Sequence, residues 1–173
     1  AIYALAHVSG KGNNIGGLVG EVSYYTLYAR YQYYPSLLNN YFYGVVDGKE
    51  QVGGLVGHVY IGIINYCYTH SSVSGIKNVG GVCGLIESES PNYKSQIFSN
   101  VVILSFVKAT LNNVGRIYGE KGNNVSIGEN GTKNENKAYN RAIVLKADVE
   151  QDITEDQQNG TDASLTTLKL EAT

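Results

Sequence analysis

Tyrosine is the residue type with the most evident binding chemistry in this sequence, with 15 copies among 173 residues. A tyrosine side chain combines an apolar ring with a polar hydroxyl, which suits stacking on a sugar or packing in a protein interface. Aromatic residues are also common in β-strands, so a hairpin packed on the flank of the fold is the structural alternative. Both interpretations stay open here. As candidate ligand-binding residues we take the six tyrosines of one short stretch: Tyr24, Tyr25, Tyr28, Tyr31, Tyr33 and Tyr34.

No arrangement of residues indicates catalysis. The sequence lacks the Gly-x-Ser-x-Gly turn of serine hydrolases and the His-Glu-x-x-His pattern of zinc peptidases. Sugar-cleaving carboxylate pairs would need two acids side by side, and the repeated part of the chain offers only Glu21, Asp47, Glu50 and Glu87. Asp47 and Glu50 flank a turn, where solubility explains them. We therefore predict a protein that is not an enzyme, with no catalytic residue and no cofactor.

Histidine and cysteine do not form a metal-binding pattern. His7, His58 and His70 fall at different positions of the repeat described below, so they predict no ladder of ligands. Cys67 and Cys83 are not part of a Cys-x-x-Cys motif, and we predict no metal site. Both cysteines occupy apolar positions, which favours buried thiols that act as small hydrophobic groups. A disulfide between them is the alternative if the protein is exported.

The elements that must position these side chains come from an internal repeat. A block of the type Gly-Gly-Leu-Val-Gly occurs in four copies, the last of them degenerate, which identifies a repeat protein. The pattern lacks the Lys-Ser/Thr that would follow in a phosphate-binding loop, so repetition of structure is the better explanation. The four copies span residues 14–20, 51–57, 78–84 and 113–119.

A second block, an asparagine followed by aromatic residues, precedes each later glycine block. Residues 40–43 and 65–68 are the best copies, and we align Asn40 with Asn65. This alignment places Cys67 at the position of Phe42. Cys83 falls at the position of the valines Val19 and Val56 in the glycine blocks.

The glycines of the repeat predict the coils of a β-solenoid. Glycine adopts backbone conformations at corners that other residues resist, and it lets two backbones approach closely. Arg116 replaces glycine in the fourth copy, and because a narrow core does not accept arginine, we predict that its position points outward. Alternation then points the neighbouring aliphatic position inward. That position contains Leu18, Leu55, Val82 and Ile117.

The extra length of the longer repeats enters at one point of the unit. The two insertions, at residues 21–39 and 87–99, both follow a glycine block. In a stacked array such insertions lie on one side, which is often the binding side. We expect 87–99 to be a polar loop. The spacing of the tyrosines in 21–39 also fits a short helix, which stays an alternative to a hairpin there.

The repeated blocks resemble the GLUG motif of bacterial adhesin-like surface proteins and of some secreted immunoglobulin A peptidases. The resemblance covers roughly residues 4–119 and depends on the glycine blocks and the asparagine-aromatic strands. Residues 160–165 are similar to a closing segment of such proteins from Bacteroidetes. The resemblance implies a bacterial protein at the cell surface or in the extracellular space with a cell-adhesion role. It implies neither a catalytic site nor a defined ligand.

Composition excludes several classes of function. Residues 1–146 contain 12 basic and 8 acidic residues, and residues 147–173 contain one basic and seven acidic ones. There is no basic stripe for nucleic acid and no apolar run of the roughly 20 residues that span a membrane. The acidic tail either keeps the end of the fold soluble or holds a weak calcium site. Because methionine is absent, we expect the sequence to begin inside a longer precursor or to be a processed product.

We therefore predict an all-β fold, a parallel β-solenoid or β-helix of about four short coils. Residues 1–137 form the GLUG-type repeat solenoid with its tyrosine-rich side insertion, and residues 138–173 form a C-terminal cap within one domain. Polar caps protect the open strand edge at which such stacks end. Within the cap we expect strands at 141–149 and 164–170.

The function we predict is that of a non-catalytic, adhesin-like binding module, surface-located or secreted. Its partners would be a host or microbial glycan or a surface protein, contacted through the loops on one side of the solenoid. The alternative is a structural spacer or accessory repeat domain of a larger secreted protein such as a peptidase.

Overall fold

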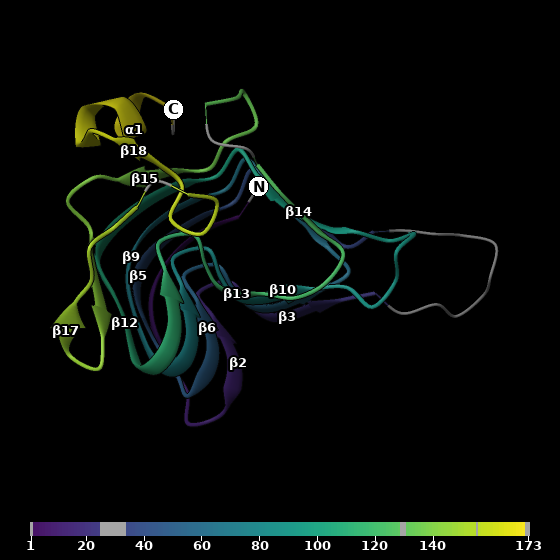
Figure 1. Ribbon diagram of the computed structural model, residues 1–173, viewed down its shortest axis with the longest axis horizontal. Coiled ribbons are helices and arrows are strands. Elements are labelled where there is room, and N and C mark those ends of the chain that lie inside the picture. The colour runs from purple at the N-terminus through teal and green to yellow at the C-terminus, as the bar shows by residue number, and fades with distance from the viewer. Residues whose placement is uncertain (1, 25–33, 129–130, 155, 172–173) are drawn as a thin grey trace.

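The chain winds as a parallel β-solenoid in a computed structural model that describes residues 2–24, 34–128, 131–154 and 156–171. Each turn of the chain, which we call a coil, contributes strands to three sheets, so segments far apart in sequence lie side by side (Figure 1). Two of the sheets contain four strands each, one per coil. The predicted all-β solenoid of about four coils is confirmed.

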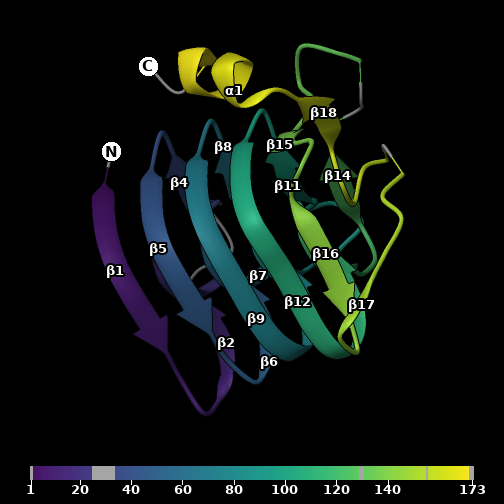
Figure 2. The same cartoon turned by 90° about the vertical axis from the view of Figure 1, so that its left-hand side faces the viewer.

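Sheet A, the largest, is seen face-on in Figure 2. Its main path runs through β1 (Tyr3–Ser9), β5 (Tyr41–Asp47), β9 (Tyr68–Gly80), β12 (Val101–Gly115), β15 (Lys137–Tyr139) and β18 (Thr161–Ala163). Four shorter strands extend it: β2 (Asn13–Gly16), β6 (Glu50–Gly53), β16 (Ile143–Lys146) and β17 (Val149–Glu150). Its pairings are parallel except that of β16 with β17.

Sheets B and C complete each coil. Sheet B contains β3 (Val19–Ser23), β7 (Val56–Tyr60), β10 (Cys83–Glu87) and β13 (Tyr118–Lys121). Sheet C contains β4 (Ser36–Leu38), β8 (Ile63–Asn65), β11 (Ser95–Phe98) and β14 (Val125–Ile127). The one described helix, α1 (Leu165–Glu171), follows β18 at the C-terminal end.

Side chains of the strands alternate between a core inside the coils and the outer surface. In β5, Phe42 and Val46 are fully buried, whereas Tyr43 and Val45 are exposed. The inward aliphatic position of the glycine blocks is confirmed, because Leu55, Val82 and Ile117 are fully buried. On the outer face of sheet A, the rings of Tyr3, Tyr41 and Tyr68 stack with centroids 4.5 Å apart. That distance matches the spacing of strands, about 4.8 Å, so parallel register stacks identical residues on one another.

Two corners of each coil use left-handed backbone conformations. The first residue of each glycine block has a positive φ, and asparagine fills three of the four positions because it tolerates this conformation. These four residues are Asn14, Gln51, Asn78 and Asn113, with φ between 52° and 57°. Asn113 also donates a side-chain hydrogen bond of 2.8 Å to Asn78 in the coil below. A second such set, Asn39, Tyr66 and Ser99, lies where sheet C leads into sheet A.

The alignment of Asn65 with Asn40 is wrong by two residues. In the pairing of β5 with β9, Tyr41 lies opposite Tyr68 and Phe42 opposite Thr69. Cys67 therefore occupies the position of Asn40, and Asn65 ends β8 opposite Leu38. A shift of two residues keeps every side chain on the same face, so alternation alone could not detect the error.

Both cysteines are free and buried, and no disulfide forms between them. Cys83 lies opposite Val56 in sheet B, as the repeat predicted. Burial raises the pKa of both thiols, with backbone hydrogen bonds partly opposing the effect at Cys67. Their environment is that of small apolar core residues.

The expectation that Arg116 points outward is wrong, because its side chain is completely buried. Its guanidinium lies 2.6 Å from the carboxylate of Asp162 in β18, and donates hydrogen bonds to the backbone oxygens of Tyr139 and Gly160. All three partners belong to the C-terminal segment that closes the last coil. Arg116 has room where the earlier copies need glycine, because no further glycine block stacks on it.

The C-terminal segment continues sheet A, and its helix then packs against one end of the sheet. The strand expected within 141–149 is confirmed by β16, but the strand expected at 164–170 is wrong, because these residues form α1. Ser164 caps the helix by accepting a hydrogen bond of 3.2 Å from the backbone N–H of Thr167. Leu168, fully buried, packs against Tyr68, Val101 and Ile103. An N-cap serine followed by an apolar contact explains why helix prevails over strand.

Buried tyrosines make the stability of the fold sensitive to high pH. Burial, followed by the charge of Asp156, raises the pKa of Tyr118 from 10.0 to about 12. A raised pKa gives stability that is complete below the unfolded value and is lost as pH rises through the folded value. We expect the free energy of unfolding to fall by about 1 kcal/mol per such phenol between pH 9 and 11. Urea titrations of the protein and of Tyr118→Phe check this; an unchanged slope in the variant would contradict it.

Candidate functional site

Both insertions leave the solenoid at the corner between sheets B and C, as the repeat spacing predicted. The first lies between β3 and β4, and the second between β10 and β11. In the coil between them, only Ile61 and Gly62 separate β7 from β8. The second loop is shorter than the predicted 87–99, because its last part forms β11. The strands that lead into the two insertions, β3 and β10, thus run to the same side of the molecule, at the right of Figure 1.

Three tyrosines from the two insertions meet at this corner. The ring of Tyr93 lies 5.9 Å from that of Tyr24 and 6.0 Å from that of Tyr34, between centroids. Tyr24 and Tyr34 are themselves 6.4 Å apart. We call these three residues the tyrosine cluster. Such separations are typical of favourable contacts between aromatic rings.

The six predicted tyrosines divide into two groups. Tyr24 and Tyr34 belong to the cluster, and Tyr34 is 36% exposed. The other four, Tyr25, Tyr28, Tyr31 and Tyr33, lie outside the described residues, as does the part of 21–39, residues 25–33, that the helix alternative concerns. Sequence reasoning missed Tyr93. Its signal was a lone aromatic residue within the second insertion, at the same point of the repeat as the first.

Serine side chains hold the loop that presents Tyr93. Ser88 is buried, and its hydroxyl donates to the backbone oxygen of Tyr93 at 2.5 Å and accepts from the backbone N–H of Ser90 at 3.1 Å. Ser95, also buried, donates to the backbone oxygen of Glu87 at 2.6 Å. Short polar side chains that bond neighbouring backbone groups stabilise turns. The position of Tyr93 is therefore fixed by the loop itself.

A row of charged groups lies beside the cluster on sheet B. The half-buried ring of His58 lies 3.1 Å from a carboxylate oxygen of Glu87 and 3.9 Å from one of Glu21. In the pairing of β3 with β7, His58 lies opposite Glu21. These groups come from three coils and contact one another across the sheet. Within the described ranges, no group of three or more histidine, cysteine or acidic side chains could hold a metal ion.

One arrangement superficially resembles hydrolytic machinery. Asp47 contacts both His7, at 2.9 Å, and the hydroxyl of Ser74. A serine nucleophile requires histidine between the serine and the acid, because the imidazole must take the hydroxyl proton. Here the carboxylate occupies the middle, so the row does not activate Ser74. It is better explained as a polar ladder on the outer face of sheet A.

Comparison of the chain with protein-family models, with curated proteins and with solved structures found no match. The resemblance to GLUG-motif proteins thus stays a prediction from the repeat itself. Among the described residues, no helix is long and apolar enough to cross a membrane.

Proposed function

We propose that the protein is a non-catalytic, adhesin-like binding module of a bacterial surface or secreted protein. It contacts a host or microbial glycan, or a surface protein, through the tyrosine cluster. The observation that carries this proposal is the meeting of Tyr93 with Tyr24 and Tyr34, which come from insertions in different coils. The two insertions have unrelated sequences, yet both place tyrosine at the same corner. This supports one common binding surface rather than two independent loops.

The physical basis is a rigid support for aromatic contacts. Tyrosine supplies a large amphipathic surface and loses little side-chain entropy on binding, because it has few rotatable bonds. The paired strands of the solenoid fix the corner from which the loops extend. Most of the conformational entropy of this surface is therefore lost during folding and not on binding. Several weak contacts along such a rod would combine into useful avidity.

The first experiment is array binding. The purified protein and a variant lacking residues 24–35 are applied to glycan and extracellular-matrix arrays, with circular dichroism to confirm that both retain the β-fold. Binding lost in the deletion variant supports the proposal. Absence of binding by both proteins would favour the alternative role of a structural spacer or accessory domain.

Point substitutions in the cluster give a sharper prediction. We expect Tyr34→Ala combined with Tyr93→Ala to weaken binding of the array ligand at least about tenfold, since aromatic anchors dominate such interfaces. The matched control is Tyr43→Ala, which removes a tyrosine 42% exposed on the outer face of sheet A. Equal affinities of the double variant and the control, measured by biolayer interferometry, would refute the role of the cluster.

A further inference from the structure

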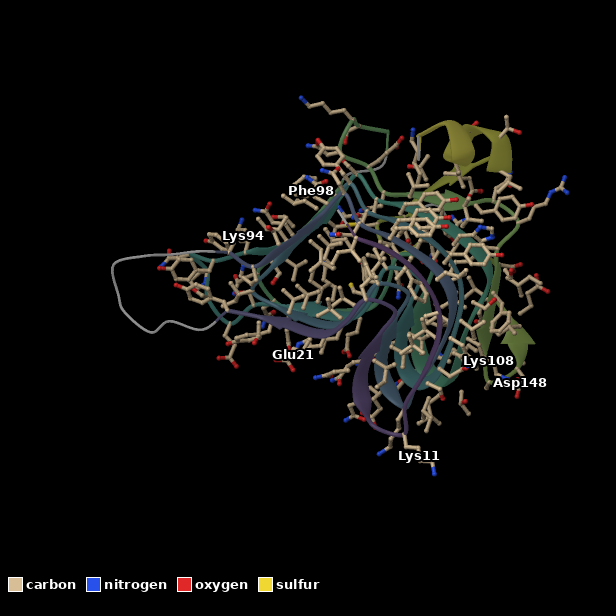
Figure 3. The ribbon with its side chains drawn as sticks, turned by 180° about the vertical axis from the view of Figure 1, so that it is seen from behind. Lys11, Glu21, Lys94, Phe98, Lys108 and Asp148 are labelled. Atoms are coloured by element: carbon tan, nitrogen blue, oxygen red, sulfur yellow. The ribbon has the colours of Figure 1, made fainter. Side chains whose placement is uncertain are left out.

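A separate groove follows the corner where sheet C leads into sheet A, on the side of sheet C away from the tyrosine cluster. It consists of two hollows, of about 320 and 520 Å³, which share Thr132 and Lys133 in the turn between them. The first is also lined by Tyr66 and Lys137, and the second by Phe98. Figure 3 shows Phe98 on the outer side of the fold. Hollows of this volume accept small ligands or the units of a polymer.

Tyr66 is the most unusual residue of the groove. Its side chain is 60% exposed, although its backbone has a φ of 52°. At the same corner the neighbouring coils carry Asn39 and Ser99, small polar residues that accept this conformation more readily. Tyr66 therefore has a backbone conformation that is unfavourable for a bulky residue, and burial of its ring in the core does not offset this cost. Strain kept at an exposed aromatic residue favours a role in recognition.

The turn at residues 131–134 is firmly attached to the rest of the groove. Its residue Asn134 accepts a backbone hydrogen bond of 3.0 Å from Ser99. Glu135 accepts hydrogen bonds from the N–H of Gly131 at 2.6 Å and the hydroxyl of Thr161 at 2.7 Å. Contacts to both the third coil and the C-terminal segment thus hold the turn that carries Lys133.

Among the charged side chains that line the groove, one lysine is not compensated by a described acidic side chain. Glu135 lies 3.5 Å from the ammonium of Lys137. Partial burial alone would raise the pKa of Glu135, but hydrogen bonds from Thr161 and Gly131 and the charge of Lys137 hold it below its usual value. Glu135 therefore stays ionised and compensates Lys137. The side chain of Lys133 is exposed and forms no ion pair with any residue that the structure describes, so it can face an anionic ligand.

We propose that this groove binds an acidic saccharide, with a sugar ring against Tyr66 and its carboxylate at Lys133. Aromatic rings stack on the apolar faces of sugars, and the hydroxyl and amide groups around them, such as those of Ser99 and Gln96, suit sugar hydroxyls. The second hollow, beside Phe98, would receive the next unit of the chain. This site is independent of the tyrosine cluster and goes beyond the function proposed above.

The test uses tri-galacturonate as the acidic probe and its neutral methyl ester as the comparison, in isothermal titration calorimetry. We expect the protein to bind the acid at least about tenfold more tightly than the ester, with affinity falling as salt rises. Lys133→Gln should abolish that preference. Tyr66→Asn, which introduces the residue type found at Asn39, should weaken both probes at least about tenfold and leave the fold intact.

One control makes the result decisive. Lys94→Gln, which removes an exposed lysine on the other corner, should bind the acid like the unaltered protein. Equal binding of acid and ester, no binding of either, or unchanged binding by Lys133→Gln and Tyr66→Asn would overturn the proposal. Full displacement of the acid by an equal concentration of inorganic sulfate would also overturn it, because a simple anion site would then explain the data.

Discussion

Replacing Gly54 by alanine is expected to prevent stable folding. The added Cβ would lie 2.0 Å from the backbone oxygen of Gly81 in the next coil, and within 3.0 Å of the hydroxyls of Ser71 and Thr69. The nearest obstacle is backbone that is itself hydrogen-bonded to both neighbouring coils, so it cannot move without separating the stack. We expect a loss of more than about 4 kcal/mol, a large share of the stability of a typical domain. Soluble yield and urea denaturation measure the effect.

The matched control for this prediction is Gly12→Ala. A Cβ at Gly12 would have no heavy atom within 4 Å, and the stability should change by less than about 0.5 kcal/mol. The comparison separates close packing between coils from the general effect of removing a glycine. If Gly54→Ala unfolded at nearly the same urea concentration as Gly12→Ala, the spacing of the coils described above would be wrong.

Arg116→Ala is expected to cost about 3 kcal/mol of stability. The substitution removes a fully buried side chain and leaves the backbone oxygens of Tyr139 and Gly160 without their donors. It also removes the ion pair with Asp162, which joins the last coil to β18. Breaking a buried pair by removing one partner typically costs about 3–5 kcal/mol, and the partly exposed carboxylate places this case at the lower end. Urea unfolding monitored by circular dichroism measures the loss.

The ion pair of Lys108 with Asp148 provides the control. Its atoms lie 2.5 Å apart, but its carboxylate is largely exposed, and both residues stand on the outside of the fold in Figure 3. Lys108→Ala should cost less than about 1 kcal/mol, as exposed pairs do. A loss for Arg116→Ala no larger than that for Lys108→Ala would show that Arg116 does not fasten the C-terminal segment.

The candidate binding surfaces could be predicted only in part. The insertion at 21–39 could be predicted as a binding surface because it is rich in tyrosine. The repeat predicted that the loop at 87–99 lies on the same side. Tyr93 was missed because its signal, one aromatic residue in a polar loop, is weak beside the tyrosine-rich first insertion. Tyr66 was treated as part of a strand, since its left-handed conformation depends on the register of the coils.

The sequence by itself determined the solenoid. Stacking in parallel register puts equivalent residues of successive coils in contact, so similar residues must recur at those positions, and this recurrence is visible as a repeat. It also determined the corner of the insertions. Only the tertiary structure decided between registers that fit the repeat equally well, and only it placed residues that depart from the repeat. A two-residue shift preserves alternation, so only the pairing of Tyr41 with Tyr68 placed Cys67 correctly. Arg116 is buried because the C-terminal segment covers it with Asp162, and contacts between segments so distant in sequence leave no periodic trace.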